Sequence, residues 1–294
     1  MSESENSLIK AVKEKGKSLE AEMSFFDHLD VLRKHLIRSS LAIIVFTGVA
    51  FAYYDFIFDT IIMGPKNPQF WTYRMMCSLS EKFNLGPDFC ITKIPFAIIN
   101  TEMAGQFTLQ LNSSLMIGII LGFPYLLFEV WRFVKPALHE KERKSASGFT
   151  FYATLLFIVG IMFGYYIIAP LSISFLASYI VSDTIDNMIT IDSYLSTVAT
   201  LTIGAGVIFE LPIIIYILSK LGVMTPKFMR SSRRYATVII LIIAAVVTPT
   251  PDLLTMLTVS FPLFLLYEAS IYISARVEKK KLQAELEFDK GINN

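Results

Sequence analysis

The stretch FEVWRFVKPALHEKERK, residues 128–144, has the composition of a membrane helix that is ending. An apolar run leads into it, Trp131 and Phe133 follow, and Pro136 interrupts helical hydrogen bonding. Aromatic residues are enriched where a spanning helix meets the membrane surface, and lysine and arginine are enriched in cytoplasmic loops. Glutamates are interspersed among these cations, although cations alone would suffice to anchor such a loop. The position of these carboxylates is the feature that a functional interpretation must explain.

The remainder of the chain has a matching composition. Of its 294 residues 54% are hydrophobic and only 17% are charged, and the apolar residues form blocks. A bilayer is crossed by roughly 20 apolar helical residues, and lipid leaves the backbone no other hydrogen-bond partner. We therefore expect an all-α integral membrane protein with six transmembrane helices, of which the fifth is short. The expected spans are about 36–58, 103–131, 149–169, 191–218, 235–247 and 253–273.

The distribution of lysine and arginine predicts the orientation. These residues are concentrated before residue 39, near 132–148, near 219–234 and after 273, whereas residues 171–190 contain none. The positive-inside rule places these basic regions, and with them both termini, in the cytoplasm. The loop at about 59–102 also carries basic residues, but long loops follow the rule weakly. The polar stretch 1–22 does not resemble a signal peptide and is expected to be a flexible cytoplasmic tail. Residues 277–294 are expected to form a cytoplasmic tail at the other end of the chain.

The first outer loop is long enough to have structure of its own. It contains both cysteines of the chain, Cys77 and Cys90. An outward-facing compartment permits a disulfide between them, and two free or buried thiols are the alternative.

Glu210 is the most informative single residue at membrane depth. It lies ten residues before Lys220, which at 1.5 Å per residue is roughly 15 Å from the cytoplasmic end of its span. A charge at that depth costs about 3 kcal/mol, so such carboxyls usually have a function. The alternative is a protonated carboxyl that hydrogen-bonds backbone groups freed by Pro212. Glu129 and Glu268 lie closer to the cytoplasmic surface.

The sequence does not support a catalytic interpretation. HEKER at 139–143 lacks the second histidine of a zinc protease, and no phosphate-binding G-x-x-x-x-G-K-[ST] occurs. We therefore expect no enzyme activity, no cofactor and no metal site, and the net charge of +1 gives no indication of nucleic-acid binding.

Five motifs together resemble the TatC family, the multi-span subunit of the twin-arginine (Sec-independent) protein translocase. They occur in the family's order between about residues 25 and 276, which defines a TatC-like membrane domain at 23–276. The motifs are HLDVLRKHL (28–36), FPYLLFEVWRFVKPALHEKERK (123–144), FELP (209–212), TPTPD (248–252) and YEASIYISAR (267–276).

This resemblance implies a receptor in the bacterial cytoplasmic (inner) membrane. It would bind the twin-arginine signal peptides of folded precursor proteins at its cytoplasmic face. With small single-span partners similar to TatA and TatB it would export these precursors, driven by the proton gradient. The resemblance also implies a concave helix bundle and self-association within the receptor complex.

The resemblance assigns the signal-peptide site to residues near the cytoplasmic surface. By its position in the motif, Glu142 corresponds to the acid that pairs with the arginines of the signal peptide. An acid suits this role because two guanidinium groups favour charge-assisted, bidentate carboxylate contacts. The aromatic surface beside it would come from Phe133 and Trp131, and Arg143 would hold the loop at the anionic leaflet. The family's second acid aligns with Val31 here, so either Asp30 or Asp27 is expected to replace it.

The remaining family positions lie within or beside the membrane. Glu210 corresponds to the buried glutamate on the concave side, and its expected role is to anchor a partner's helix. The wider set of polar intramembrane or partner-site residues is Glu210, Glu129, Asp252 and Thr248, and the expected structural prolines are Pro65, Pro136 and Pro212.

Two other classes of protein were weighed against a translocase receptor. A secondary transporter would show inverted repeats and a midplane site built from broken helices. The prolines and Glu210 fit such a site loosely, but no repeat is visible in the sequence. A pure scaffold would need no buried acid.

Overall fold

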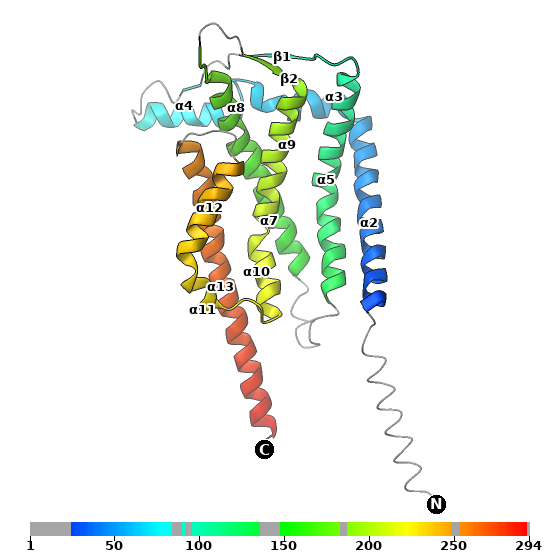
Figure 1. The fold of residues 1–294 in the computed structure, drawn as a ribbon, viewed down its shortest axis with the longest axis vertical. Coiled ribbons are helices and arrows are strands. Elements are labelled where there is room, and N and C mark those ends of the chain that lie inside the picture. The colour runs from blue at the N-terminus through cyan, green and yellow to red at the C-terminus, as the bar shows by residue number, and fades with distance from the viewer. Residues whose placement is uncertain are drawn as a thin grey trace, which may run out of the picture.

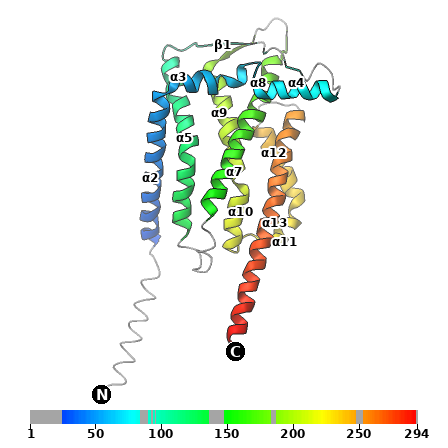
Figure 2. The ribbon, with the colours of Figure 1, turned by 180° about the vertical axis from the view of Figure 1, so that it is seen from behind.

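The computed structural model describes residues 25–83, 90–91, 94, 96–135, 148–182, 187–247 and 253–292. Its long helices run side by side, with α2 and α5 at one flank and α12 and α13 at the other (Figures 1 and 2). Their bounds are α2 (Phe25–Ala52), α5 (Gly105–Val134), α7 (Phe149–Phe163), α8 (Ala169–Ser178), α9 (Ile191–Ile208), α10 (Leu211–Lys220), α12 (Arg233–Val247) and α13 (Leu253–Ile292).

Within the described ranges, five helical stretches are long and apolar enough to cross a membrane. They are Leu29–Ala52, Gly105–Val134, Thr150–Ser178, Ile191–Lys220 and Thr255–Gln283. Helix α12 is apolar but has only 15 residues, which corresponds to about 22 Å against a hydrocarbon thickness of about 30 Å. This short helix, α12, corresponds to the fifth of the six spans expected from the sequence.

Several expected boundaries differ from those of the structure. The first expected span corresponds to α2, which begins earlier, at Phe25, and ends at Ala52 rather than at residue 58. The third expected span continues from α7 through the π-helical η5 (Gly164–Ile168) into α8, so Pro170 does not end it. Proline has no backbone N–H to donate, and the π-helical turn before Pro170 changes the hydrogen-bond pattern so that the helix continues past it. Helix α13 continues to Ile292, well beyond the expected end of the sixth span.

The first outer loop is structured and lies across one end of the bundle (Figure 1). It contains α3 (Tyr54–Phe56), η1 (Ile57–Ile62), η2 (Gly64–Lys66) and α4 (Trp71–Phe83). It also contains β1 (Ala97–Ile99), which pairs in parallel with β2 (Met188–Thr190) of the second outer loop. We call this layer the outer cap, after the orientation that the distribution of basic residues predicts, and it joins two loops that are distant in sequence.

Tyrosine hydroxyl groups fasten the outer cap to the bundle. The hydroxyl of Tyr73 donates to the carbonyl oxygens of Pro65 at 2.8 Å and of Pro170 at 3.1 Å. Tyr194 donates to the carbonyl of Ile62 at 2.8 Å. Burial raises the pKa of Tyr73 far above its usual value, which keeps the hydroxyl protonated as a donor.

Cys77 and Cys90 form a disulfide within the outer cap, with their Cα atoms 4.3 Å apart. The disulfide is the alternative that the structure supports over two free thiols.

Helices α2 and α5 pack closely because α5 presents glycines to α2. A Cβ atom added to Gly118 would lie 2.8 Å from the backbone nitrogen of Thr47, and one added to Gly122 would lie 2.8 Å from Cγ1 of Ile43. The two glycines form the G-x-x-x-G pattern typical of close helix contacts in membranes. Since Thr47 faces Gly118 and Ile43 faces Gly122, the helices run antiparallel in a fixed register.

The close contact at Gly118 and Gly122 predicts how a larger residue there changes the stability of the protein. Gly118→Ala should lower the free energy of unfolding by about 1–3 kcal/mol, because the methyl group meets backbone atoms that must move. Gly48→Ala is the matched control, since nothing lies within 4 Å of its added Cβ. The control should be neutral or stabilising by about 0.4–1 kcal/mol. Thermal unfolding of both variants in detergent measures the difference, and equal stabilities would contradict the predicted packing.

Candidate functional site

A polar cluster around one buried carboxylate joins α2 and α5 near the end of the bundle opposite the outer cap. The imidazole Nδ1 of His35 donates to carboxylate Oε2 of Glu129, and the hydroxyl of Tyr125 donates to Oε1 at 2.7 Å. The side chains of His35 and Glu129 are only 12% and 2% exposed. Both oxygens of Glu129 are therefore satisfied within the chain, as a buried carboxylate requires. We call these residues the His35–Glu129–Tyr125 cluster.

The aromatic residues expected at the signal-peptide site differ in their exposure. Trp131 is 6% exposed and packs in an apolar cluster with Leu127 and Ala153, so its ring supports the site from inside the bundle. Phe133 is partly exposed. Its ring and the imidazole ring of His35 form a T-shaped contact, with centroids 6.2 Å apart. Of the two aromatic residues expected at the signal-peptide site, Phe133 is the one that the structure leaves partly accessible.

The acids expected to bind arginine are only partly described. Asp30 is exposed on α2 and forms an ion pair with Lys34 at 3.0 Å, one turn further along the helix. Asp27 lies on α2, but its side chain is outside the described part of the structure. Pro136, Glu142 and Arg143, as well as Thr248 and Asp252, lie outside the described residues.

Glu210 lies at the break between α9 and α10. Its backbone caps α10, and Pro212 occupies the first turn, where a missing N–H is tolerated. Glu210 is 5% exposed, and within the described residues neither carboxyl oxygen has a hydrogen-bond partner. This burial counts against the expected role of Glu210 as an anchor that a partner's helix could reach directly in a single chain. An unpaired buried polar group is costly, and such groups concentrate at functional positions.

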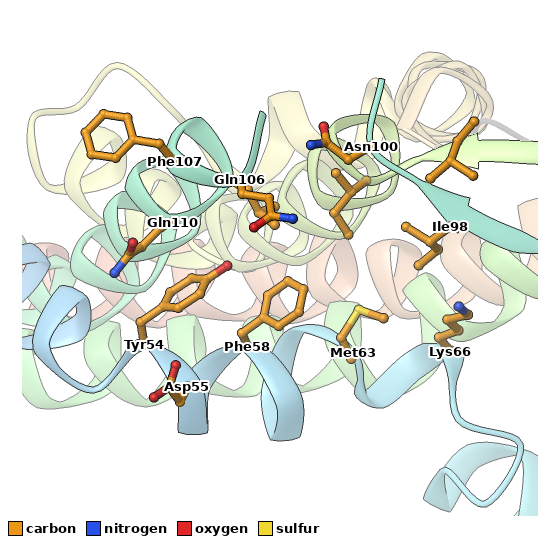
Figure 3. A pocket seen from close by; sticks show the side chains of 13 residues that line it. Tyr54, Asp55, Phe58, Met63, Lys66, Ile98, Asn100, Gln106, Phe107 and Gln110 are labelled. Atoms are coloured by element: carbon orange, nitrogen blue, oxygen red, sulfur yellow. The ribbon is translucent and has the colours of Figure 1, made fainter. Parts of the chain in front are cut away.

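The structure also contains a cavity beneath the outer cap that the sequence did not predict. Figure 3 shows side chains of Tyr54 and Phe58 from the outer cap, Gln106 and Gln110 from the first turns of α5, and Ile98 from β1 around it. Its volume is about 890 Å³. Its lining includes Ile98 and Ile99 of β1, the strand that pairs with β2 about 90 residues further along the chain.

Comparison with known proteins identifies the family. The family model for the Sec-independent protein translocase protein (TatC) matches residues 27–262. The chain belongs to the TatC family. It is 37% identical to the TatC protein of Blattabacterium sp. subsp. Periplaneta americana over 261 residues, which cover 88% of this chain and 98% of the relative. It is 32% identical to TatCy of Bacillus subtilis, covering 93% and 96% of the two chains.

Solved TatC structures share the fold. A crystal structure described as the twin arginine translocase receptor TatC has a TM-score of 0.61 and 28% identity, covering 85% of this chain and 99% of that one. A second, in the detergent DDM, has a TM-score of 0.64 and 30% identity, covering 84% and 99%. The present chain is therefore a multi-pass membrane protein of the TatC family, as the sequence motifs predicted.

Sequence reasoning missed two of the three members of the cluster that joins α2 to α5. Glu129 was noted only as a possible intramembrane polar or partner residue, whereas it bonds His35 and Tyr125 of its own chain. The G-x-x-x-G pattern at 118–122 was a signal for the contact between these helices, and it fixes the register that brings His35 opposite Glu129.

Proposed function

We propose that this TatC-family protein is the receptor and core subunit of a twin-arginine translocation system. It binds the twin-arginine signal peptides of folded precursors at its cytoplasmic face. With small single-span partner proteins it exports them across the bacterial cytoplasmic membrane, using the proton gradient. The protein has six spans with a short fifth, both termini cytoplasmic, and no enzymatic activity of its own.

The observation that carries this proposal is the match to TatC over residues 27–262, together with solved relatives described as twin-arginine translocase receptors. The arrangement of helix ends supports it. The start of α2, the end of α5 and the start of α7 all lie at the end of the bundle opposite the outer cap (Figures 1 and 2). The described part of the motif that begins at residue 123 ends there, at the last turn of α5 with Phe133, which supports a recognition site on this side of the bundle.

Capture of a precursor tests the proposal directly. The detergent-solubilised protein should retain a folded precursor with a twin-arginine signal peptide and release one whose two arginines are replaced by lysine. The reason is that guanidinium groups make bidentate carboxylate contacts that an ammonium group cannot reproduce. Equal capture of both precursors, or of neither, would contradict a twin-arginine receptor.

A further inference from the structure

The His35–Glu129–Tyr125 cluster is a polar link within an otherwise close-packed helix contact. It lies beyond the glycine contact, on the side where α5 ends, and it continues the same register from Ile43 and Gly122 to His35 and Glu129. Two hydrogen bonds hold the carboxylate, one to each oxygen, and a hydrogen bond weakens steeply when its donor is misaligned. The cluster therefore sets the relative position of the two helix ends more narrowly than apolar packing does.

Phe133 connects this cluster to the surface. It follows Glu129 by one helical turn and lies on the same face of α5. Its ring meets the ring of His35 at an interplanar angle of 67°. The last turn of α5, from which residues 136–147 continue, is thus held against α2 by the cluster.

We propose that the His35–Glu129–Tyr125 cluster positions the arginine-binding residues and thereby sets the preference for arginine over lysine. This inference rests on the proposed function and assigns positioning residues to its site. The carboxylate of Glu129 is enclosed, so the cluster acts through Phe133 and through the first turns of α2, which carry Asp30, rather than by binding the signal peptide itself. A bidentate guanidinium contact requires accurately placed oxygens, whereas an ammonium group needs only a nearby negative charge. Loosening the site should therefore weaken arginine binding more than lysine binding.

The ratio of two affinities tests this positioning role. The purified protein in detergent is titrated with a synthetic twin-arginine signal peptide and with its twin-lysine counterpart. His35→Ala should lower affinity for the arginine peptide by about tenfold, the effect of losing one charge-assisted hydrogen bond. Affinity for the lysine peptide should change much less, so the ratio of the two falls. Tyr125→Phe, which removes a single hydroxyl, should lower the ratio by a smaller factor and covers the case in which His35→Ala does not fold.

The ion pair between Arg233 of α12 and Glu268 of α13 provides the matched control. It also joins two helices, with Nη2 of Arg233 2.7 Å from Oε2 of Glu268, but it lies on the far flank of the bundle. Glu268→Ala should leave the affinity ratio at the wild-type value. A ratio that stays constant in Tyr125→Phe, or affinities that fall in proportion for both peptides, would show that the cluster is only structural. A wild-type protein without a preference for arginine would instead remove the proposed function and this inference with it.

Discussion

Replacement of Glu142 by alanine is expected to abolish binding of twin-arginine signal peptides while leaving the protein folded in the membrane. Each charge-assisted hydrogen bond to a carboxylate contributes about 1.5–3 kcal/mol, so the loss of a bidentate contact should reduce affinity at least 100-fold. The alanine is tolerated structurally because this acid belongs to a polar segment between two spans. Titration of the solubilised variant with a fluorescent twin-arginine signal peptide measures the loss.

Glu140→Ala is the appropriate control for this prediction. It removes an equal charge from the same segment, two residues away. If Glu142 acts by specific pairing, Glu140→Ala should change affinity by no more than a few-fold, as expected for a screened surface charge. Equal losses in both variants would mean that the segment attracts the peptide only through its net charge. Wild-type affinity in Glu142→Ala would exclude the residue from recognition.

Blocks of apolar residues are local properties of the sequence, and within the described ranges five helical stretches are long and apolar enough to cross a membrane. The end of the first span was placed too late because the apolar run continues through Phe58, where the chain has already turned into the outer cap. The end of the third span was placed too early because Pro170 normally interrupts a helix, whereas here η5 accommodates it. Hydrophobicity alone cannot distinguish these cases.

The contacts that build the site and the outer cap were beyond local patterns. The strands of the cap have three residues each and pair across about 90 residues of sequence. The bond between His35 and Glu129 likewise joins residues 94 positions apart. The bond between His35 and Glu129 depends on the register in which α2 and α5 pack. The sequence indicates this register only through small residues such as Gly118 and Gly122.

The second large effect is expected at Glu210. We predict that Glu210→Leu raises the stability of the isolated protein and abolishes export. Leucine has a similar volume and removes two acceptors that are unpaired within the described residues, which should stabilise the fold by about 1–3 kcal/mol. If Glu210 served only the fold, selection for stability would favour an apolar residue here. A destabilised group at membrane depth, at a break between α9 and α10, is instead suited to accept a hydrogen bond from a partner's helix during assembly or transport.

Three measurements on Glu210→Leu separate these roles. The thermal midpoint in detergent should rise, twin-arginine peptide binding should stay unchanged, and cross-linking to single-span partners and export in cells should fall. Thr202→Val is the matched control, because Thr202 Oγ1 is also buried without a partner among the described residues and belongs to the same helix as the break. It should raise the thermal midpoint slightly and leave export intact. Wild-type export by Glu210→Leu would show that the carboxyl has no role in the partner contact, whatever its effect on stability. The Glu210 side chain is enclosed by its own chain. A hydrogen-bond donor from a partner can therefore reach the carboxyl only if the break between α9 and α10 opens when the complex forms.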